Sequence, residues 1–331
     1  MANNVIVTGG AGFIGSSLCK VLFKNNFHPI TVDNLSTGFR QLVKYGDFIE
    51  ADIGDYDKMM EVFAKYKPLA VFHIAASKSV AESVVNPHKY YENNFSKTNT
   101  LLKAVVDSQI QHFIFSSTAA VFGLIQDKEK YIDESAPTNP INPYGASKLM
   151  VERLLEDYEK AYGLKYSALR YFNVSGADPE CEMGEMSANV ANIFPLLLRV
   201  IDKKQDGFTI FGDDYNTKDG TCIRDYIHVT DLANAHLLAL QKQLENNKSA
   251  RINLGNGQGF SVKDVVDVFK KITNVDFKVS IGGRRSGDPD LLIANNKFAN
   301  QYLNWQPKYT NLADHVDHAW KWHQKIKNYE K

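Results

Sequence analysis

Short apolar runs alternate with longer amphipathic stretches over the first two-thirds of the chain. The apolar runs, rich in β-branched and aromatic residues, predict strands at 5–7, 29–32, 70–74, 112–116 and 166–170. Between them, apolar residues at helical spacing predict helices at 13–24, 99–108 and 143–162. Strands that alternate with helices form βαβ units, and strands without polar alternation are buried on both faces. The pattern therefore predicts an α/β fold built on a doubly wound parallel sheet.

The alternation becomes irregular after Tyr171. Two segments, 173–189 and 206–220, are rich in Gly, Asp, Asn and Glu, which predicts loops or a short hairpin. Regularity returns with a predicted helix at 226–243 and a predicted short strand at 251–254. We therefore expect a second, smaller domain that is partly interleaved with the sheet domain. The expected division gives the sheet domain residues 1–174 and about 222–255, and the smaller domain residues 175–221 and 256–331.

Composition narrows the class of ligand. The 331 residues are 44% hydrophobic and 23% charged, which excludes disordered and fibrous architectures. Lys plus Arg number 38 and Asp plus Glu also number 38, so the chain has no bulk attraction for nucleic acid or for an anionic membrane. Any anionic ligand must be held by a few local groups, which favours a small-molecule site.

Three cysteines, Cys19, Cys181 and Cys222, lie far apart in the sequence without C-x-x-C spacing. They predict neither a disulfide framework nor a zinc site, and we expect no metal and a reducing, cytoplasmic location. The N-terminus lacks the basic and long apolar segments of a signal peptide. The most apolar stretch, 193–201, is too short to cross a bilayer.

A glycine-rich segment separates the first predicted strand from the first predicted helix. Residues 8–15, Thr-Gly-Gly-Ala-Gly-Phe-Ile-Gly, satisfy both G-x-G-x-x-G and G-x-x-G-x-x-G. Such glycines allow a tight turn and close approach of the backbone to a pyrophosphate, which then meets the helix N-terminus. Together with the strand before and the helix after, the segment predicts a dinucleotide-binding Rossmann domain.

Asp33 ends the second predicted strand, 18 positions beyond Gly15. Its carboxylate suits the ribose hydroxyls of NAD and would repel the 2′-phosphate of NADP, so we predict NAD. The alternative is that Asp33 only caps a turn with Asn34. Asp52 and Ile53, which lie between the predicted strands at 29–32 and 70–74, are candidates for contact with the adenine.

Tyr144 and Lys148 have Y-x-x-x-K spacing, a pattern that also arises by chance in a chain of this size. Asn142 is a plausible N-cap and Pro143 a plausible first residue of their helix, which places both side chains on one face. Thr118 follows a strand at the carboxyl edge of the sheet, where open α/β sheets bind ligands. We predict that Tyr144 is a general base, because a nearby ammonium and the positive nicotinamide ring favour the phenolate. The alternative is an exposed Tyr and Lys on a surface helix.

With these motifs in this order, the chain resembles the extended short-chain dehydrogenase/reductases. The blocks at 115–123 (FSSTAAVFG), 142–148 (NPYGASK), 169–173 (LRYFN) and 224–228 (RDYIH) resemble the UDP-glucose 4-epimerase family more narrowly. The resemblance implies tightly held NAD, a homodimer, and interconversion of UDP-galactose and UDP-glucose through a 4-keto sugar. It also implies that Lys148 orients the nicotinamide ribose and lowers the pKa of Tyr144.

The resemblance also assigns residues to ligands. It implies NAD contacts for Gly9, Gly12, Phe13, Ile14, Asp33, Asn34, Asp52, Ile53, Ala75, Lys78, Asn94, Tyr144, Lys148 and Tyr171. It implies UDP-hexose contacts for Thr118, Tyr144, Asn173, Asn192, Thr209, Phe211, Arg224, Arg285, Asp288 and Leu292. Guanidinium groups bind phosphate oxygens in a bidentate way, so Arg224 and Arg285 are sensible diphosphate ligands, or else surface ion-pair partners of Asp225 or Asp288.

One departure from the family pattern and two kinds of rival function bear on this assignment. Leu292 stands where some members of the family have a bulky tyrosine beside the sugar, so UDP-N-acetylhexosamines are also candidate substrates. Dehydratases and decarboxylases on the same scaffold need an acid or base after the hydroxyl residue, whereas Ala119 and Ala120 follow Thr118. A non-catalytic NAD(H)-binding regulator is the alternative from another class.

Overall fold

The computed structural model describes residues 3–124, 131–186, 192–285 and 288–327. Its main sheet has seven strands, all parallel, in the order β10-β6-β5-β4-β1-β2-β3. These strands are β1 (Asn4–Thr8), β2 (His28–Asp33), β3 (Asp47–Glu50), β4 (Ala70–His73), β5 (His112–Thr118), β6 (Lys165–Tyr171) and β10 (Ala250–Leu254). The strand order reverses beside β1, as in doubly wound Rossmann sheets. The predicted fold class is confirmed.

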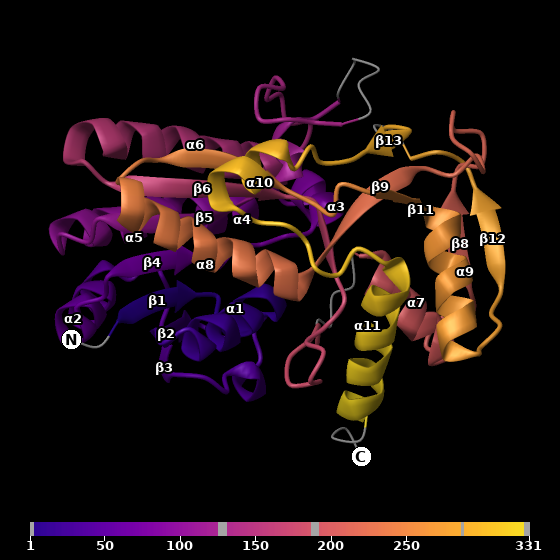
Figure 1. Ribbon diagram of the computed structural model, residues 1–331, viewed down its shortest axis with the longest axis horizontal. Coiled ribbons are helices and arrows are strands. Elements are labelled where there is room, and N and C mark those ends of the chain that lie inside the picture. Colours follow the sequence, from indigo (N-terminus) through magenta and orange to yellow (C-terminus); the bar gives the residue numbers. More distant parts are fainter. Residues whose placement is uncertain (1–2, 125–130, 187–191, 286–287, 328–331) are drawn as a thin grey trace.

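Helices cover both faces of this sheet (Figure 1). One face packs against α1 (Phe13–Lys24), α8 (Val229–Asn246) and α10 (Lys297–Leu303). The other packs against α2 (Tyr56–Tyr66), α5 (Lys97–Asp107) and α6 (Pro143–Tyr162). Side chains along a strand alternate between faces, so Val5 and Val7 enter the first core while Ile6 enters the second. All three are fully buried, which explains why the strands are apolar without interruption.

A smaller assembly lies beyond the carboxyl ends of these strands, on the right of Figure 1. In it β9 (Ile223–His228) pairs with β7 (Asn173–Ser175), β11 (Gly259–Ser261) and β13 (Leu291–Leu292). A separate pair joins β8 (Phe208–Phe211) to β12 (Val279–Gly282). Helices α7 (Ile193–Ile201), α9 (Val262–Thr273) and α11 (Leu312–Lys327) complete its apolar core.

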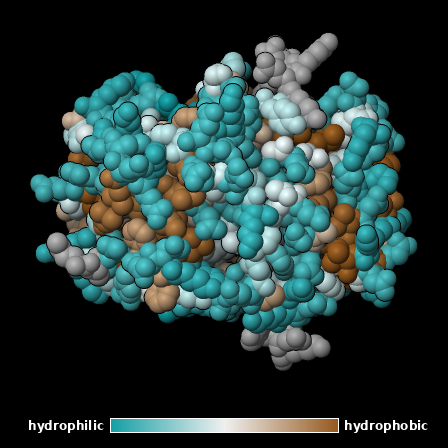
Figure 2. Space-filling view, in the orientation of Figure 1, coloured by the Kyte–Doolittle hydropathy of each residue, from teal (hydrophilic) through white to brown (hydrophobic). Residues whose placement is uncertain are grey.

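Short helices connect the larger elements near the carboxyl edge of the main sheet. They are α3 (Val80–Val85), α4 (Pro87–Tyr91), a π-helical turn (Glu92–Ser96) that joins α4 to α5, and 3₁₀ turns at Arg40–Leu42 and Ala119–Val121. The face of the molecule in Figure 2 is mainly hydrophilic, with apolar residues gathered toward its two ends. In the described residues, no helix has the length and apolar character needed to cross a bilayer.

Several predicted elements differ from the structure. The predicted helix at 226–243 begins too early, because its first three residues belong to β9 and α8 begins at Val229. The predicted loop at 173–189 contains β7, and its last three residues lie outside the described part. The predicted loop or hairpin at 206–220 contains β8, whose partner β12 is parallel and about seventy residues away. Each of these strands pairs with a distant segment, which local patterning does not reveal.

The division into two domains remains a prediction, but two elements bear on its boundaries. The sequence predicts segment 222–255 to be part of the sheet domain, yet among the described residues β9 pairs only with strands of the smaller assembly. Conversely, α10 was assigned to the smaller domain, and its Ala299 and Leu303 pack into the core of the main sheet. The two parts are therefore more interleaved than the sequence indicated.

Candidate active site

A cavity of about 870 Å³ opens at the carboxyl edge of the main sheet. Its wall is formed by the loops after β1, β2, β3, β4, β5 and β6, by the start of α6, and by a segment before β13. The strand order reverses beside β1, and at such a point two loops diverge and leave a crevice. The fold therefore places the cavity where doubly wound sheets bind their ligands.

The glycine-rich loop, which leads from β1 into α1, lines one end of the cavity. Gly9 has a φ of +71°, and a Cβ there would lie 2.6 Å from the main-chain nitrogen of Ala75. A Cβ on Gly15 would lie 2.2 Å from the carbonyl oxygen of Gly9. A larger residue at Gly9 would therefore push the loop away from the segment after β4, and one at Gly15 would push α1 away from the loop.

Asp33, the last residue of β2, forms a hydrogen bond with this loop. Its carboxylate accepts hydrogen bonds from the main-chain N–H groups of Ala11 (3.0 Å) and Leu35 (2.9 Å). Burial raises the pKa of Asp33, and the two bonds oppose that effect. The turn-capping alternative is thus part of the structure, and Asp33 also lines the cavity.

Asp52 lies beside Asn34 at the same end of the cavity. It accepts hydrogen bonds from Asn34 Nδ2 (3.0 Å) and Lys97 Nζ (2.6 Å), and these bonds lower its pKa despite partial burial. Both residues are polar and partly accessible, so they can contact a polar ring or a ribose. Lys97 belongs to α5 and was not anticipated as part of this group.

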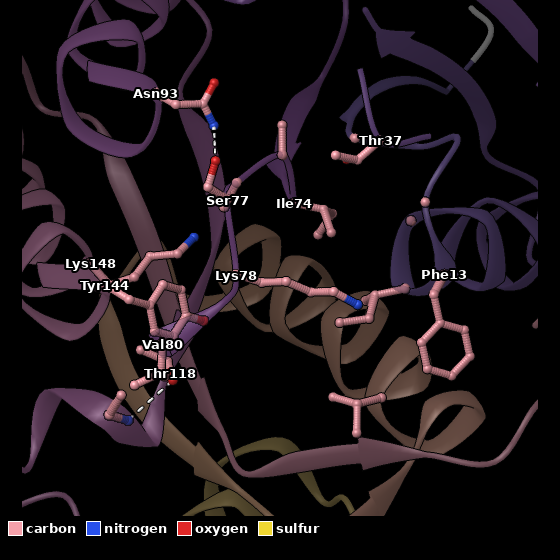
Figure 3. A pocket seen from close by; sticks show the side chains of 18 of the residues that line it. Phe13, Thr37, Ile74, Ser77, Lys78, Val80, Asn93, Thr118, Tyr144 and Lys148 are labelled. Atoms are coloured by element: carbon pink, nitrogen blue, oxygen red, sulfur yellow. Dashed lines mark hydrogen bonds between the residues drawn. The ribbon is translucent and has the colours of Figure 1, made fainter. Parts of the chain in front are cut away.

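Helix α6 carries Tyr144 and Lys148 into the opposite end of the cavity. The side chain of Asn142 accepts a hydrogen bond from Gly145 N (2.9 Å), and Pro143 is the first helical residue, as predicted. Lys148 Nζ donates to the carbonyl of Ser116 on β5 (3.0 Å). Figure 3 shows Tyr144, Lys148 and Thr118 grouped together, with Lys78 pointing across the pocket.

Burial acts on both candidate catalytic side chains. It lowers the pKa of Lys148 to about 7 and raises the pKa of Tyr144, while a hydrogen bond with Thr118 opposes the rise for Tyr144. The buried surroundings of Tyr144 thus favour its neutral phenol. This result differs from our prediction that a neighbouring ammonium lowers the pKa of Tyr144. The reason is desolvation, which disfavours the charged form of either group.

Most of the predicted residues line this one cavity. From the NAD set it is lined by Gly9, Gly12, Phe13, Ile14, Asp33, Asn34, Asp52, Ile53, Ala75, Lys78, Tyr144, Lys148 and Tyr171. From the UDP-hexose set it is lined by Thr118, Tyr144, Asn173, Asn192, Asp288 and Leu292. The residues that lie outside its wall are Asn94, Thr209, Phe211, Arg224 and Arg285.

Asn94 is buried behind the cavity wall, in the π-helical turn before α5. Its amide accepts from Ser77 N (2.8 Å) and donates to Ser77 O (3.0 Å) and to Ser147 Oγ (3.2 Å). It therefore holds the loop that carries Ser77 and Lys78 against α6. The neighbouring Asn93 lines the cavity instead.

Arg224 lies just outside the wall and is bonded to the segment that closes the cavity. Its Nη1 donates to the carbonyl of Pro289 (2.9 Å), and its Nη2 lies 3.3 Å from the carboxylate of Asp288. Arg285 is exposed, with its guanidinium carbon 4.1 Å from the ring centre of Phe211. Thr209 makes a hydrogen bond with Ser280 across the β8–β12 pair.

Several lining residues were not anticipated, and Glu185 is the most informative of them. Its carboxylate lies 2.8 Å from Lys78 Nζ, and its carbonyl accepts from the indole of Trp322 on α11 (3.1 Å). Glu185 lies in a predicted loop, 107 residues from Lys78. No sequence signal joins them, because only the fold brings that loop to the cavity. In the part of the chain that is described, no cluster of His, Cys, Asp and Glu is suited to hold a metal ion.

The chain is similar in sequence and in overall structure to several known proteins. Residues 5–255 match the model of the NAD dependent epimerase/dehydratase family. The chain is 44% identical to a UDP-glucose 4-epimerase of Halalkalibacterium halodurans, over 97% of this chain and 95% of that protein. It superposes on a UDP-glucose 4-epimerase of Brucella ovis in complex with NAD with a TM-score of 0.94, at 44% identity, covering 97% and 99% of the two chains. A UDP-Glc/GlcNAc 4-epimerase of Campylobacter jejuni gives a TM-score of 0.86 at 40% identity, covering 98% and 99%.

Proposed function

Because the chain belongs to the NAD dependent epimerase/dehydratase family, we propose that it is an NAD-dependent isomerase that interconverts UDP-galactose and UDP-glucose. The observation that carries the proposal is the shared cavity. One end is floored by the glycine-rich loop and Asp33, and the other holds Tyr144, Lys148 and Thr118. A cofactor that spans the cavity would bring its reactive ring to these three side chains.

The residues present fit NAD. Gly9 and Gly15 leave no room for a Cβ against Ala75 and against the carbonyl of Gly9, so the loop packs tightly between β4 and α1. A glycine loop of this kind at a helix N-terminus suits a pyrophosphate. Asp33 offers a carboxylate at the end of β2, which suits ribose hydroxyls and disfavours a 2′-phosphate. When bound, NAD supplies a reversible hydride acceptor for C4 of the sugar.

Tyr144 is the proposed general base and acid. It takes the proton of the sugar O4 hydroxyl and later returns a proton to the same oxygen. With the hydride of C4 accepted and then given back by the bound cofactor, C4 would pass through a ketone. Thr118, whose side chain lies beside the Tyr144 ring (Figure 3), can share the O4 proton through a hydrogen bond from its hydroxyl. Burial raises the pKa of Tyr144, so the phenol needs a nearby positive charge in order to lose its proton. Protonated Lys148 supplies such a charge, together with the oxidised nicotinamide.

For the substrate, Asn173, Asn192 and Leu292 line the same cavity. Arg224 and Arg285 remain proposed ligands of the diphosphate, as the sequence indicated. Arg224 already bonds the Asp288–Pro289 segment at the cavity wall, so a diphosphate would compete with Asp288 for its guanidinium.

A second substrate class follows from Leu292. Its branched side chain lines the sugar end of the cavity and is smaller than a tyrosine, which leaves space for an N-acetyl group. The Campylobacter jejuni protein, which is described as a UDP-Glc/GlcNAc 4-epimerase, shows that a protein of this fold can accept both kinds of sugar. We therefore also propose activity on UDP-N-acetylhexosamines.

The function is tested by incubating the purified protein with UDP-galactose, and separately with UDP-N-acetylgalactosamine, without added cofactor. We expect the C4 epimer of each as the product. Tyr144→Phe should retain NAD and UDP but lose turnover by roughly 100-fold or more, as expected for removal of a general base. Tyr158→Phe is a matched control, since Tyr158 is also on α6 but outside the cavity wall.

A keto or dehydrated product, or net release of NADH, would contradict epimerisation. Unchanged turnover in Tyr144→Phe would contradict the base assignment alone. We also propose, from sequence, a homodimer and a cytoplasmic location, and sedimentation of the purified protein tests the first of these.

A further inference from the structure

Three residues of α6, spaced one turn apart, contact three consecutive residues of β5. Tyr144 lies beside the side chain of Thr118 (Figure 3), Lys148 donates to the carbonyl of Ser116 (3.0 Å), and Glu152 accepts from the hydroxyl of Ser117 (2.5 Å). The first two contacts involve the proposed catalytic groups. The third lies one turn deeper, away from the cavity wall, and the proposed mechanism does not use it.

Glu152 is tied to two further strands. Its carboxylate accepts two hydrogen bonds from Arg170 on β6, at 2.6 Å from Nη2 and 3.0 Å from Nε. It accepts another from Arg251 Nε on β10 (3.1 Å). The side chains of Glu152 and Arg170 are 1% and 4% exposed, so this ion pair is removed from water. One carboxylate thus joins α6 to three adjacent strands of the sheet.

Stability alone is a weak reason for such an arrangement. A buried ion pair must offset the desolvation of both charges, and apolar replacements of similar volume are often as stable. What the charges provide here is geometry, because a carboxylate and a guanidinium form a planar pair with fixed directions. The hydroxyl of Ser117 adds a contact on β5 between the two residues that meet Lys148 and Tyr144.

We propose that Glu152 is a positioning residue for the reaction, acting through Ser117 and Arg170. It holds the catalytic face of α6 at a fixed separation from the end of β5, and so sets the distance from Tyr144 to Thr118 and to the sugar oxygen that both must reach. The reaction part of this inference rests on the proposed function. The structural part, the attachment of α6 to β5, does not.

The test compares Ser117→Ala with Ser167→Ala in the NAD-loaded protein. Both serines are buried on neighbouring strands, and each makes one short side-chain hydrogen bond, Ser117 to Glu152 (2.5 Å) and Ser167 with Gln243 (2.7 Å). Both variants should therefore lower the unfolding midpoint by a similar amount, roughly 2–4 °C. Neither serine lines the cavity.

The two variants should differ in catalysis and in local dynamics. Ser117→Ala should lower kcat for UDP-galactose by roughly 10-fold or more with less than about a 3-fold change in KM, because small displacements of a catalytic group are costly. Its backbone amides at 144–152 should also exchange faster with deuterium. Ser167→Ala should leave kcat and this exchange unchanged. Glu152→Gln, which keeps the shape and removes the charge, should follow Ser117→Ala.

The outcomes separate this inference from the proposed function. If the wild-type protein has no epimerase activity, the proposed function fails, and exchange at 144–152 still tests the attachment of α6. If the wild type is active and Ser117→Ala matches Ser167→Ala in kcat and in exchange, the positioning role is wrong. If Glu152→Gln does not fold, the Ser117→Ala comparison decides alone.

Discussion

At the scale of residues, Tyr144 and Lys148 show how burial acts in opposite directions on an acid and a base. Burial raises the pKa of the phenol and lowers that of the ammonium to about 7, so the protein walls favour neutral forms of both. Lys148 can therefore be charged or neutral near physiological pH. A positive charge close to the pair would then have a large effect on Tyr144, because little water is present to screen it.

Leu292 gives a test of substrate choice at the same scale. Leu292→Tyr should lower kcat/KM for UDP-N-acetylgalactosamine by roughly 10- to 100-fold, because the larger ring would occupy the space proposed for the N-acetyl group. Activity on UDP-galactose should change much less. The neighbouring Leu291 lies on β13 but not in the cavity wall, so Leu291→Tyr is the matched control. Equal losses on both sugars would contradict the steric explanation.

At the scale of elements, α11 is attached to the rest of the molecule through a group of buried histidines. Thr230 N donates to His228 Nδ1 (3.2 Å), so the other nitrogen of His228 carries hydrogen and donates to His318 on α11 (3.1 Å). His315, also on α11, accepts from the hydroxyl of Ser175 (2.7 Å). The bond from Thr230 requires an unprotonated Nδ1 on His228, because protonation would place an N–H group against a backbone donor. In the neutral ring of His315, Nδ1 accepts from Ser175.

This arrangement predicts a loss of stability in mild acid. Burial lowers the pKa values of His228, His315 and His318, that of His315 to about 4, despite nearby Asp314 and Asp317. In the unfolded chain, histidines take up protons below about pH 6.5, whereas in the folded protein these three rings stay neutral to lower pH. Proton binding therefore favours the unfolded state as the pH falls. The contribution of the three histidines to stability is present above about pH 6.5 and is lost toward pH 4. For His315 alone we expect a loss of about 2 kcal/mol between pH 7 and pH 5.

Denaturant unfolding of wild type and His315→Gln at the two pH values checks this expectation. Glutamine keeps a donor and an acceptor but does not titrate, so the variant should lose less stability on acidification. Equal losses in the two proteins would show that His315 does not titrate as described.

At the scale of the whole molecule, one buried lysine joins α1 to the loop that leads toward Glu185. Lys20 Nζ lies 2.7 Å from Asp178, 3.0 Å from Glu180 and 2.6 Å from Glu182. The side chains of Lys20 and Asp178 are only 7% and 8% exposed. The three carboxylates raise the pKa of Lys20 in spite of its burial. This contact connects the first helix of the chain to a segment about 160 residues later.

Removing this lysine should destabilise the folded protein strongly. Lys20→Met leaves Asp178 buried without its partner, which should cost about 3–5 kcal/mol of unfolding free energy. Lys24 lies one turn later on α1 and forms an ion pair with Glu180, and the Lys24 side chain is 50% exposed. Because exposed ion pairs contribute little, Lys24→Met should lower the unfolding free energy by at most about 1 kcal/mol. Urea unfolding of both variants measures the difference, and similar values would refute the assigned role of Lys20.

Local patterns were sufficient for the parts of the protein that depend on neighbours in sequence. The bounds of α1 and α6 agree with those predicted, and Asn142 caps α6 as its spacing indicated. The glycine-rich loop follows from a strand, a turn and a helix within about twenty residues. Prediction failed at β8 and β9, because a strand in a loop-rich segment exists only through its distant partners.

The sequence by itself determined the α/β class, the cofactor-binding loop and the face of α6 that carries Tyr144 and Lys148. These depend on periodicity, glycine conformations and capping, which act within a few turns of chain. Only the tertiary structure decided that Glu185 meets Lys78, that Asn94 supports the wall of the cavity without lining it, and that Glu152 joins three strands. Those contacts join residues 17 to 107 positions apart, and they form only when the apolar faces of sheet and helices pack together.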